Sequence, residues 1–427
     1  MKKRVLIVFL MGIFLIGIVN ATEYYVSSSA GADTNNGLSS VAPFAHHPWD
    51  TNAGNTADST TLQSGDIVYM KKGDIWYDVQ INVEDDGNST HHIITTTKSD
   101  FGSGNNPQVY GCWNYSALSF DADGWSYTET GITTEPNIVI YNGTVLTEND
   151  TATSEVLSNQ YDWNSSNQLW VNVSEDPDNG IILIGKRNYV LYSDVGDYFT
   201  FENIEFYVSN NAAAANVFIN GRTGANLTNC TVQYSAYYNL YFASTSNSSV
   251  SNCNLTHWDG SPVQNVYINN DDSGNTIFSN NTIKFGSYGI RFAGCGNGLI
   301  IQYNNISNIT NSPIGFFNSG CPYCQITGNW LYNFGSSAYG IALGTGNDNV
   351  TINENNISEG VGGISTSSNN GSFYSNTIYG GNTGILISDS DNNSIYSNTI
   401  YDAWNDLYYG GGGCRGWNLY YKFVRRE

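Results

Sequence analysis

A pattern of apolar and polar positions repeats eight or nine times between Phe201 and Tyr409. Each repeat reads apolar residue, two others, Asn, one other, apolar residue, and successive repeats lie 21 to 28 residues apart. The first apolar position is held by Phe201, Leu227, Val250, Phe278, Ile301, Ile326, Ile352, Phe373 and Ile395. The second is held by Phe206, Val232, Leu255, Ile283, Ile306, Leu331, Ile357, Ile378 and Ile400. A period of this length predicts stacked copies of one structural unit.

A third apolar column follows each pair after a gap of variable length. Its members are Leu240, Val266, Ile290, Ile314, Ile341, Ile364, Ile385 and Leu407. Most are followed two residues later by another apolar or bulky residue, an alternation typical of strands. Helical repeats are excluded because the apolar spacing is not helical and because Gly, Asn and Ser interrupt every segment. The pattern predicts an all-β solenoid with three short strands per turn, which is a single-stranded parallel β-helix.

The polar position inside the motif is a column of asparagines. It comprises Asn281, Asn304, Asn329, Asn355, Asn376 and Asn398, with Cys230 and Cys253 in two earlier repeats. Stacked turns lie about 4.8 Å apart, so these amides are predicted to form a ladder at a tight turn. The same spacing places Cys230 and Cys253 within reach of a disulfide, although two stacked free thiols fit equally well.

The three columns and the asparagine turn resemble the right-handed parallel β-helix superfamily, which includes pectate lyases, polygalacturonases and NosD-like surface proteins. The resemblance implies a right-handed coil in which the asparagine turn joins the second and third sheets. Ile290 to Phe292 and their equivalents then form the first sheet. On that assignment Cys295 and Cys321 both lie in the turn after the first sheet in consecutive rungs, and a disulfide between them is predicted.

Five segments are predicted along the chain. Residues 1–21 resemble a secretory signal peptide, with basic residues, an apolar run from Val5 to Val19 and a small residue at Ala21. Residues 22–111 form an N-terminal β-rich cap with the first rungs, and residues 112–188, where the pattern breaks, form an inserted β subdomain. Residues 189–409 are the β-helix repeats. Residues 410–427 are a Gly-rich and basic tail without a repeat, so the open end of the solenoid is explained either by truncation or by an envelope or partner protein that covers it.

Composition supports an exported, acidic β-protein. The formal net charge is -22, which argues against nucleic acid as a partner because its binding needs clustered Lys and Arg. Seventeen Asn-x-Ser/Thr sequons follow the predicted leader, Asn142 among them, and make a secreted glycoprotein of the cell surface the expected form, with some sites used. Asp33, Asp66 and Asp74 are possible Ca²⁺ ligands, but their spacing is irregular, and no metal site is predicted from it.

The resemblance places any active site on the outward face of the first sheet and its adjoining loops. That face is predicted to carry Tyr241, Tyr267, Arg291, Gly315, Ala342, Ser365, Leu386 and Tyr408. A polysaccharide lyase needs a cation, a base and an acid, roles that Arg291 or Lys284, His257 and Tyr267 are suited to fill. The alternative is a purely structural role, in which these residues stack on one another, cap turns and form ion pairs. Substrate contacts are assigned to Trp258, Asp259, Asp271, Asp272, Tyr241 and Phe285.

Two further functions compete with the lyase. Asp271 and Asp272 resemble the paired aspartates of polygalacturonases, but the histidine and basic motifs of that family are missing here. Aromatic residues also recur in the loops entering the first sheet, where they stack on sugar rings if exposed or pack the turns if buried. The favoured hypothesis is a glycan-binding or structural protein of the cell envelope, with enzymatic activity left open.

Overall fold

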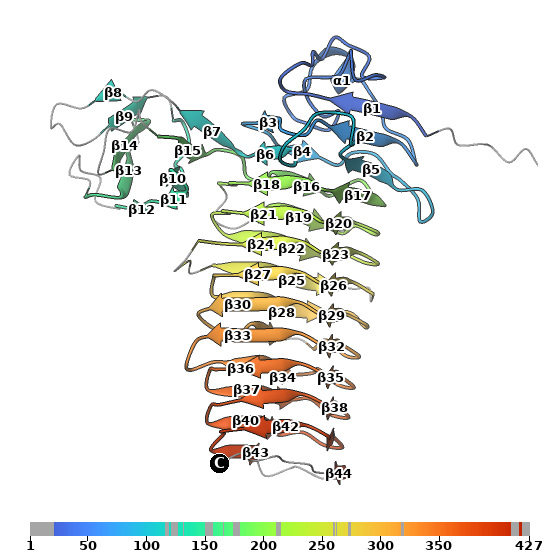
Figure 1. The fold of residues 1–427 in the computed structure, drawn as a ribbon, viewed down its shortest axis with the longest axis vertical. Helices are drawn as coiled ribbons and strands as arrows, with labels where there is room; N and C mark the ends of the chain where they lie inside the picture. Colours follow the sequence, from blue (N-terminus) through green and yellow to red (C-terminus); the bar gives the residue numbers. More distant parts are fainter. Residues whose placement is uncertain are drawn as a thin grey trace, which may run out of the picture.

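The structure is a computed structural model of the chain. It describes residues 21–115, 119–120, 127–130, 132–149, 157–164, 166–173, 180–210, 215–258, 261, 263–271, 275–316, 320–410 and 418–420. The predicted leader therefore lies outside the described residues, except for Ala21. The described chain is all-β apart from the short helix α1 (Asn55–Asp58), and most of it winds into one long coil (Figure 1).

Three parallel sheets form the walls of the coil, as the sequence predicted. In the described part of the chain the second sheet has 13 strands: β1 (Glu23–Val26), β2 (Ile67–Met70), β5 (Ile93–Thr96), β17 (Phe199–Glu202), β20 (Asn226–Thr228), β23 (Ser249–Ser251), β26 (Ile277–Ser279), β29 (Ile300–Gln302), β32 (Gln325–Thr327), β35 (Thr351–Asn353), β38 (Ser372–Tyr374), β41 (Ser394–Tyr396) and β44 (Asn418–Tyr420).

The third sheet has 11 described strands: β3 (Ile75–Trp76), β6 (Gln108–Tyr110), β18 (Glu205–Tyr207), β21 (Thr231–Gln233), β24 (Asn254–Thr256), β27 (Thr282–Lys284), β30 (Asn305–Ile309), β33 (Trp330–Phe334), β36 (Asn356–Ser358), β39 (Thr377–Tyr379) and β42 (Thr399–Tyr401). The first sheet also has 11 described strands: β4 (Ile81–Asn82), β16 (Leu191–Ser193), β19 (Ala215–Asn220), β22 (Tyr238–Ala243), β25 (Gln264–Asp271), β28 (Tyr288–Cys295), β31 (Ile314–Phe316), β34 (Tyr339–Thr345), β37 (Gly362–Ser367), β40 (Thr383–Ser388) and β43 (Asn405–Gly410).

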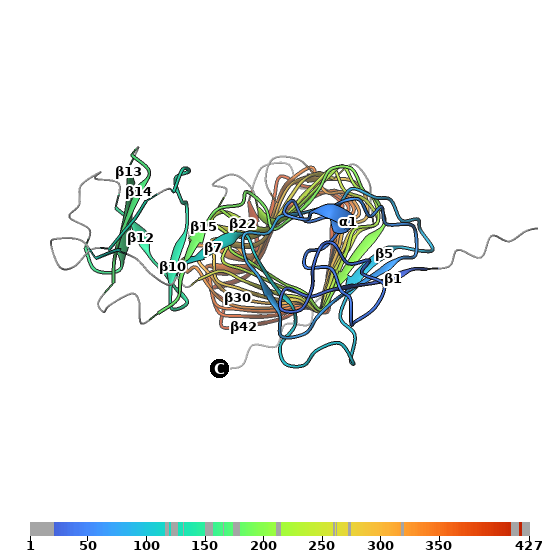
Figure 2. The ribbon, with the colours of Figure 1, turned by 90° about the horizontal axis from the view of Figure 1, so that it is seen from above.

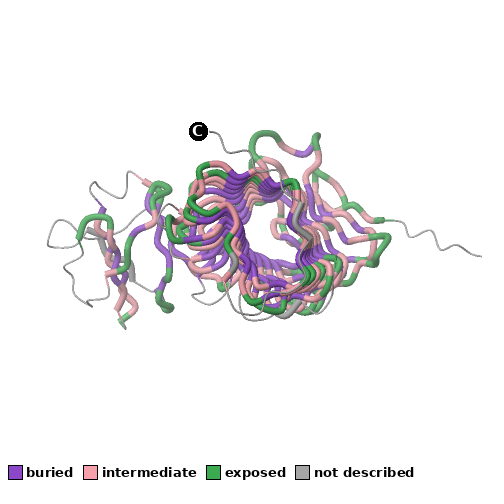
Figure 3. The backbone as a smooth tube through the Cα atoms, turned by 90° about the horizontal axis from the view of Figure 1, so that it is seen from below, coloured by how far each residue is buried: buried purple, intermediate pink, exposed green. Residues whose placement is uncertain are grey.

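The apolar columns point into the coil and form one continuous core. Each member pairs with its equivalent in the next rung, as Phe278 does with Ile301 and Ile283 with Ile306. Almost all of them are fully buried, and Figure 3 shows buried residues lining the inside of the coil along its length. Burial of like residues on like residues, rung after rung, is what sets the register of all three sheets.

The asparagine ladder is confirmed at the turn between the second and third sheets. The side-chain oxygen of Asn329 accepts bonds from the backbone N–H and the Nδ2 of Asn304, both at 3.0 Å. The Nδ2 of Asn329 donates to the Ile301 carbonyl at 3.0 Å and to the Asn355 Oδ1 at 2.9 Å. The same geometry runs from Asn281 to Asn398. The ladder thus satisfies the backbone N–H of Asn304 and Asn329 and a carbonyl such as that of Ile301, each from the next rung.

One of the two predicted cysteine pairs is correct. Cys295 and Cys321 form a disulfide that joins consecutive rungs, with Cα atoms 4.9 Å apart. Cys230 and Cys253 are buried free thiols, so that disulfide prediction is wrong and the alternative of stacked thiols holds. Their Sγ atoms donate to the carbonyls of Phe201 and Leu227, at 3.4 and 3.6 Å. They therefore take over the bonding of the asparagine Nδ2 groups at the same corner.

The N-terminal cap closes one end of the coil. It contains α1 and adds β1, β2 and β5 to the second sheet (Figure 1). The carboxylates proposed for Ca²⁺ serve its turns: the Asp33 Oδ1 accepts the backbone N–H of His46 at 2.9 Å, and the Asp74 Oδ2 accepts the Ser27 hydroxyl at 2.6 Å. Within the described residues, no group of three or more His, Cys, Asp or Glu side chains is placed to hold a metal ion.

The inserted segment forms two small sheets beside the coil (Figure 2). Their strands are β7 (Cys112–Tyr115), β8 (Ser119–Phe120), β9 (Tyr127–Thr130), β10 (Val139–Tyr141), β11 (Thr144–Val145), β12 (Thr147–Glu148), β13 (Gln160–Asn164), β14 (Gln168–Asn172) and β15 (Ile182–Gly185). One sheet has the order β11-β10-β15-β7 and is antiparallel throughout. The other has the order β12-β13-β14-β9-β8. The insert has its own buried cluster, which includes Tyr161, Leu169 and Ile184.

The tail differs from the prediction in one respect. Its residues Asn418–Tyr420 form β44, which pairs in parallel with β41 and adds a strand to the second sheet. The flanking residues 411–417 and 421–427 lie outside the described part. Among the described residues, no helix is long and apolar enough to cross a membrane.

Candidate functional site on the first sheet

The predicted outward column of the first sheet is aligned across eight strands. Tyr241, Tyr267, Arg291 and Gly315 stand opposite one another in β22, β25, β28 and β31. The column continues through Ala342, Ser365, Leu386 and Tyr408. Because side chains alternate along a strand, these residues lie outside the coil while their neighbours are buried.

The column begins two rungs earlier than the sequence analysis placed it. Tyr192 pairs with Phe218, which pairs with Tyr241. With two tyrosines from the strand starts they make a continuous row of rings, here called the aromatic strip: Tyr189, Tyr192, Phe218, Tyr238, Tyr241 and Tyr267. Centroids of neighbouring rings in the strip lie 4.7 to 5.7 Å apart. Most of the rings are half-buried, because each ring covers part of its neighbour.

The aromatic strip ends at a cation. The guanidinium carbon of Arg291 lies 5.7 Å from the ring centroid of Tyr267 and 5.4 Å from that of Tyr288. The Nδ2 of Asn311 donates to the Tyr288 hydroxyl at 2.7 Å, which orients that ring. Beyond Arg291 the outward side chains become small, at Gly315 and Ala342. The outward side chains of the first sheet therefore change from aromatic to small at the position of Arg291.

The tyrosines around Arg291 are held in their protonated form. Burial raises the pKa of Tyr267, and the neighbouring Tyr241 adds to this rise while Arg291 opposes it. Burial likewise raises the pKa of Tyr288 against the opposing charge of Arg291. Near neutral pH both phenols can donate hydrogen bonds, but neither is suited to remove a proton.

His257, the predicted base, does not reach this face. Only 1 % of its side chain is exposed, and its Nε2 donates to the Gln264 carbonyl at 3.1 Å inside the turn between β24 and β25. Burial lowers the pKa of His257 to about 4, although the bond to Gln264 works in the opposite direction. His257 therefore has the structural role of the alternative interpretation: its buried imidazole stays neutral and caps the turn through its hydrogen bond.

The other predicted site residues are dispersed. Lys284 ends β27 of the third sheet, so it lies around the corner from Arg291 rather than in the loop before the first sheet. Trp258 packs against the insert and contacts His257 edge to face, with centroids 5.4 Å apart. Phe285 follows Lys284 in a left-handed turn. Asp259 and Asp272 lie outside the described residues, as does the side chain of Asp271.

The structure thus brings together Tyr241, Tyr267 and Arg291 of the predicted set and adds Tyr288 to them. Sequence reasoning missed the upstream half of the aromatic strip, although Tyr192 and Phe218 each follow an apolar residue in the same register. It also missed a short second asparagine ladder behind the strip. In that ladder the Asn239 Nδ2 donates to the Asn265 Oδ1 at 2.8 Å, and both residues are fully buried.

Comparison with known protein families agrees with the observed β-helix fold. The family model described as "Right handed beta helix region" matches residues 171–331, 215–370 and 320–413, which together span more than half of the chain. Among curated proteins, no sequence matches the chain significantly.

Several solved structures share the architecture. A structure titled "Glycoside hydrolase" has a TM-score of 0.57 at 8% identity, covering 93% of this chain and 97% of its own. The GH136 lacto-N-biosidase from Eubacterium ramulus has a TM-score of 0.53 at 14% identity, with 93% and 68% covered. A mannuronic acid specific polysaccharide family 6 lyase from human gut microbiota has a TM-score of 0.50 at 14% identity, with 86% and 74% covered. At such identities the likeness concerns the fold alone.

Proposed function

Since this chain belongs to the right-handed β-helix family, we propose that it is an exported protein that binds a glycan chain along the outer face of its first sheet. The observation that carries the proposal is the aromatic strip and its termination at Arg291. A row of half-buried rings on the outside of a solenoid leaves apolar surface in contact with water, and such rows commonly mark a binding surface.

The chemistry of the strip suits a sugar. The rings pack against one another from rung to rung, and tyrosine combines an apolar ring with a hydroxyl that can hydrogen-bond a sugar. Arg291 adds several N–H donors in a fixed plane at the end of the row.

Binding is favoured over catalysis because the predicted catalytic set is not assembled. Removal of a proton next to a carboxylate needs a base near the cation. The protonated Tyr267 and Tyr288 surround Arg291, His257 is buried in the turn, and Lys284 extends from another sheet. The hydrolase and lyase named among the similar structures support polysaccharides or glycans as the ligand class. The lyase remains the alternative that the experiment has to exclude.

Export rests on two observations. Residues 1–21 have the composition of a secretory leader, and Cys295 and Cys321 form a disulfide, a bond typical of oxidising compartments. Expression of the full chain with its leader should yield a protein that begins near Thr22 and is accessible to protease from outside the cell. An uncleaved chain retained inside the cell would contradict export.

The binding test is affinity electrophoresis of the purified chain through gels containing xylan, mannan, polygalacturonate or alginate. At least one polysaccharide should retard the chain without release of unsaturated or reducing ends. Arg291→Ala should weaken that retention about tenfold, as expected for loss of a charged hydrogen-bond donor.

Lys284→Ala is the matched control, because it removes the same charge from the neighbouring strand β27 on a different face. It should leave retention unchanged. Equal weakening of retention by both variants would show that only net charge matters. Release of unsaturated ends by the parent chain but not by Arg291→Ala would show lyase activity instead of binding alone.

A further inference from the structure

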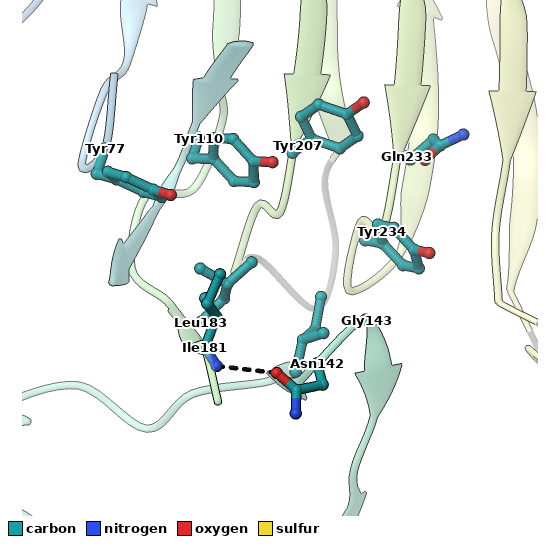
Figure 4. A pocket seen from close by; sticks show the side chains of 10 residues that line it. Tyr77, Tyr110, Asn142, Gly143, Ile181, Leu183, Tyr207, Gln233 and Tyr234 are labelled. Atoms are coloured by element: carbon teal, nitrogen blue, oxygen red, sulfur yellow. Dashed lines mark hydrogen bonds between the residues drawn. The ribbon is translucent and has the colours of Figure 1, made fainter. Parts of the chain in front are cut away.

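A second candidate site lies away from the first sheet, where the insert meets the outer face of the third sheet. A cavity of about 330 Å³ opens between them, a size within the usual range of small-molecule sites. We call it the insert pocket; it is lined by Tyr77, Tyr110, Tyr207, Gln233 and Tyr234 of the coil and by Ile140, Asn142, Gly143, Ile181 and Leu183 of the insert. Figure 4 shows the tyrosines along one side and Ile181, Leu183 and Asn142 opposite them.

The tyrosine wall follows from the register of the third sheet. Tyr110 and Tyr207 are paired residues of β6 and β18, and both follow a buried core residue, so they point outward. Their ring centroids lie 4.8 Å apart, and Tyr77 continues the stack at 5.0 Å from Tyr110. The Tyr207 hydroxyl donates to the Glu205 carboxylate at 2.7 Å. The stack is therefore ordered before any ligand arrives.

The opposite wall is held in place by buried hydrogen bonds. The side chain of Asn210, at 2 % exposure, accepts the Asn137 backbone N–H at 2.6 Å and donates to the Glu135 carbonyl at 3.0 Å. At the edge of the pocket, Asn142 and Gly143 form the two-residue turn of the β10–β11 hairpin, both with positive φ. The insert is thus fixed against the coil, and the insert pocket has two rigid walls.

Among the lining residues that the structure describes there is no Lys, Arg, His, Asp or Glu. Lys186 and Arg187, the basic residues where the insert rejoins the coil, both form ion pairs with Asp78. Glu205, already bonded to Tyr207, is the acid beside the wall. An anionic ligand would enter without a free counter-charge and close to a carboxylate, which is unfavourable in a partly enclosed site.

We propose that the insert pocket binds one neutral sugar residue, with the phenol groups and the amides of Gln233 and Asn142 contacting its hydroxyls and with Ile140 and Leu183 contacting its CH face. A cationic ligand held by ring faces fits less well, because the faces of Tyr77, Tyr110 and Tyr207 are turned toward one another. The site is independent of the aromatic strip, since it lies on another sheet and shares no residue with it.

The test is calorimetric titration of the full chain, produced in a host without N-glycosylation so that Asn142, which begins a sequon, carries no sugar. The neutral probes are N-acetylglucosamine and the methyl glycosides of glucose, galactose and mannose. The charged probes are glucuronate and glycine betaine. At least one neutral sugar should bind. Tyr207→Phe, which removes only the hydroxyl, should weaken binding roughly fivefold, and Leu183→Trp, which fills the cavity, should abolish it.

Tyr401→Phe is the matched control, because Tyr401 occupies the same outward column of the third sheet and stacks on Tyr379 at 4.7 Å. It should bind as the parent chain does, and so should Arg291→Ala. Thermal unfolding shows whether Leu183→Trp is folded, and Tyr207→Phe tests the site even if it is not. Binding of none of the neutral sugars, preference for glucuronate or betaine, or undiminished binding by Tyr207→Phe would each overturn the proposal.

Discussion

The aromatic strip and the insert pocket are built on the same principle but differ in cover and in charge. Both are rows of rings stacked at the rung spacing on the outside of a parallel sheet. The strip follows an open face and ends at Arg291, whereas the pocket tyrosines face a second wall whose described lining residues carry no charge. A solenoid repeats its outward positions, so the elements added to it decide what each row of rings can bind.

The two ends of the third sheet make the same point within one column. Tyr110 and Tyr207 stack near the N-terminal end, and Tyr379 and Tyr401 stack near the C-terminal end. The insert covers the first pair, and burial raises the pKa of Tyr207 well above its usual range. Tyr379 remains 42 % exposed. Cover by the insert, rather than the presence of tyrosine, accounts for the pocket.

The largest expected effect comes from the asparagine ladder, because each of its side chains bonds buried backbone groups of neighbouring rungs. Asn355→Ala should lower the free energy of unfolding by about 3–5 kcal/mol, since it removes the partners of the buried Asn329 N–H and of the Ile326 carbonyl. Denaturant unfolding measures the change. The exposed neighbour gives the control: Asn356→Ala should change stability by less than about 1 kcal/mol. Equal losses would show that the ladder contributes no specific stability.

A smaller effect on stability, seen only at acid pH, should come from His257 in the turn that leads into β25 of the aromatic strip. His257 has a folded-state pKa of about 4, below the unfolded value of about 6.5, so the unfolded chain binds more protons between these values. Its contribution is complete above pH 6.5 and is lost as pH falls toward 4, by about 3 kcal/mol.

Denaturant unfolding between pH 7 and pH 4 measures this loss, and His257→Gln should make the dependence shallower. Burial also lowers the pKa of His47, to about 3, and its contribution to the pH dependence should be the same in both chains, which makes it an internal reference. An unchanged slope in His257→Gln would contradict the buried, neutral state of this ring.

The smallest expected effect is the coupling between the two sites. Arg291→Ala and Leu183→Trp act on different sheets without a shared contact, so their effects should add within about 0.5 kcal/mol. The double variant, titrated with the polysaccharide and the neutral sugar, measures this. A larger coupling would mean that one glycan spans both surfaces, and the comparison between two separate sites would no longer hold.

Much of the fold could be predicted, because a solenoid turns sequence spacing directly into spatial stacking. Phe278 and Ile301 had to pair if their repeats stacked, and the outward position of Arg291 follows from Ile290 pointing inward. The site could be predicted only in part. Lys284 is close to Arg291 in sequence and His257 belongs to the preceding rung, but a corner separates each of them from Arg291. Spacing alone does not show which side of a corner a residue occupies.

The sequence by itself determined the three columns, the asparagine ladder, the bond between Cys295 and Cys321 and the outward position of the first-sheet tyrosines. These features depend on local period and on like residues meeting in neighbouring rungs. Only the tertiary structure decided that His257 is buried, that Cys230 and Cys253 stay free, and that the insert folds back over Tyr110 and Tyr207. The burial of His257 and the position of the insert depend on how non-repeating segments pack against the coil, and no period in the sequence encodes those contacts. The two thiols lie at a repeating corner, where each Sγ donates to a carbonyl of the preceding rung instead of bonding to the other sulfur.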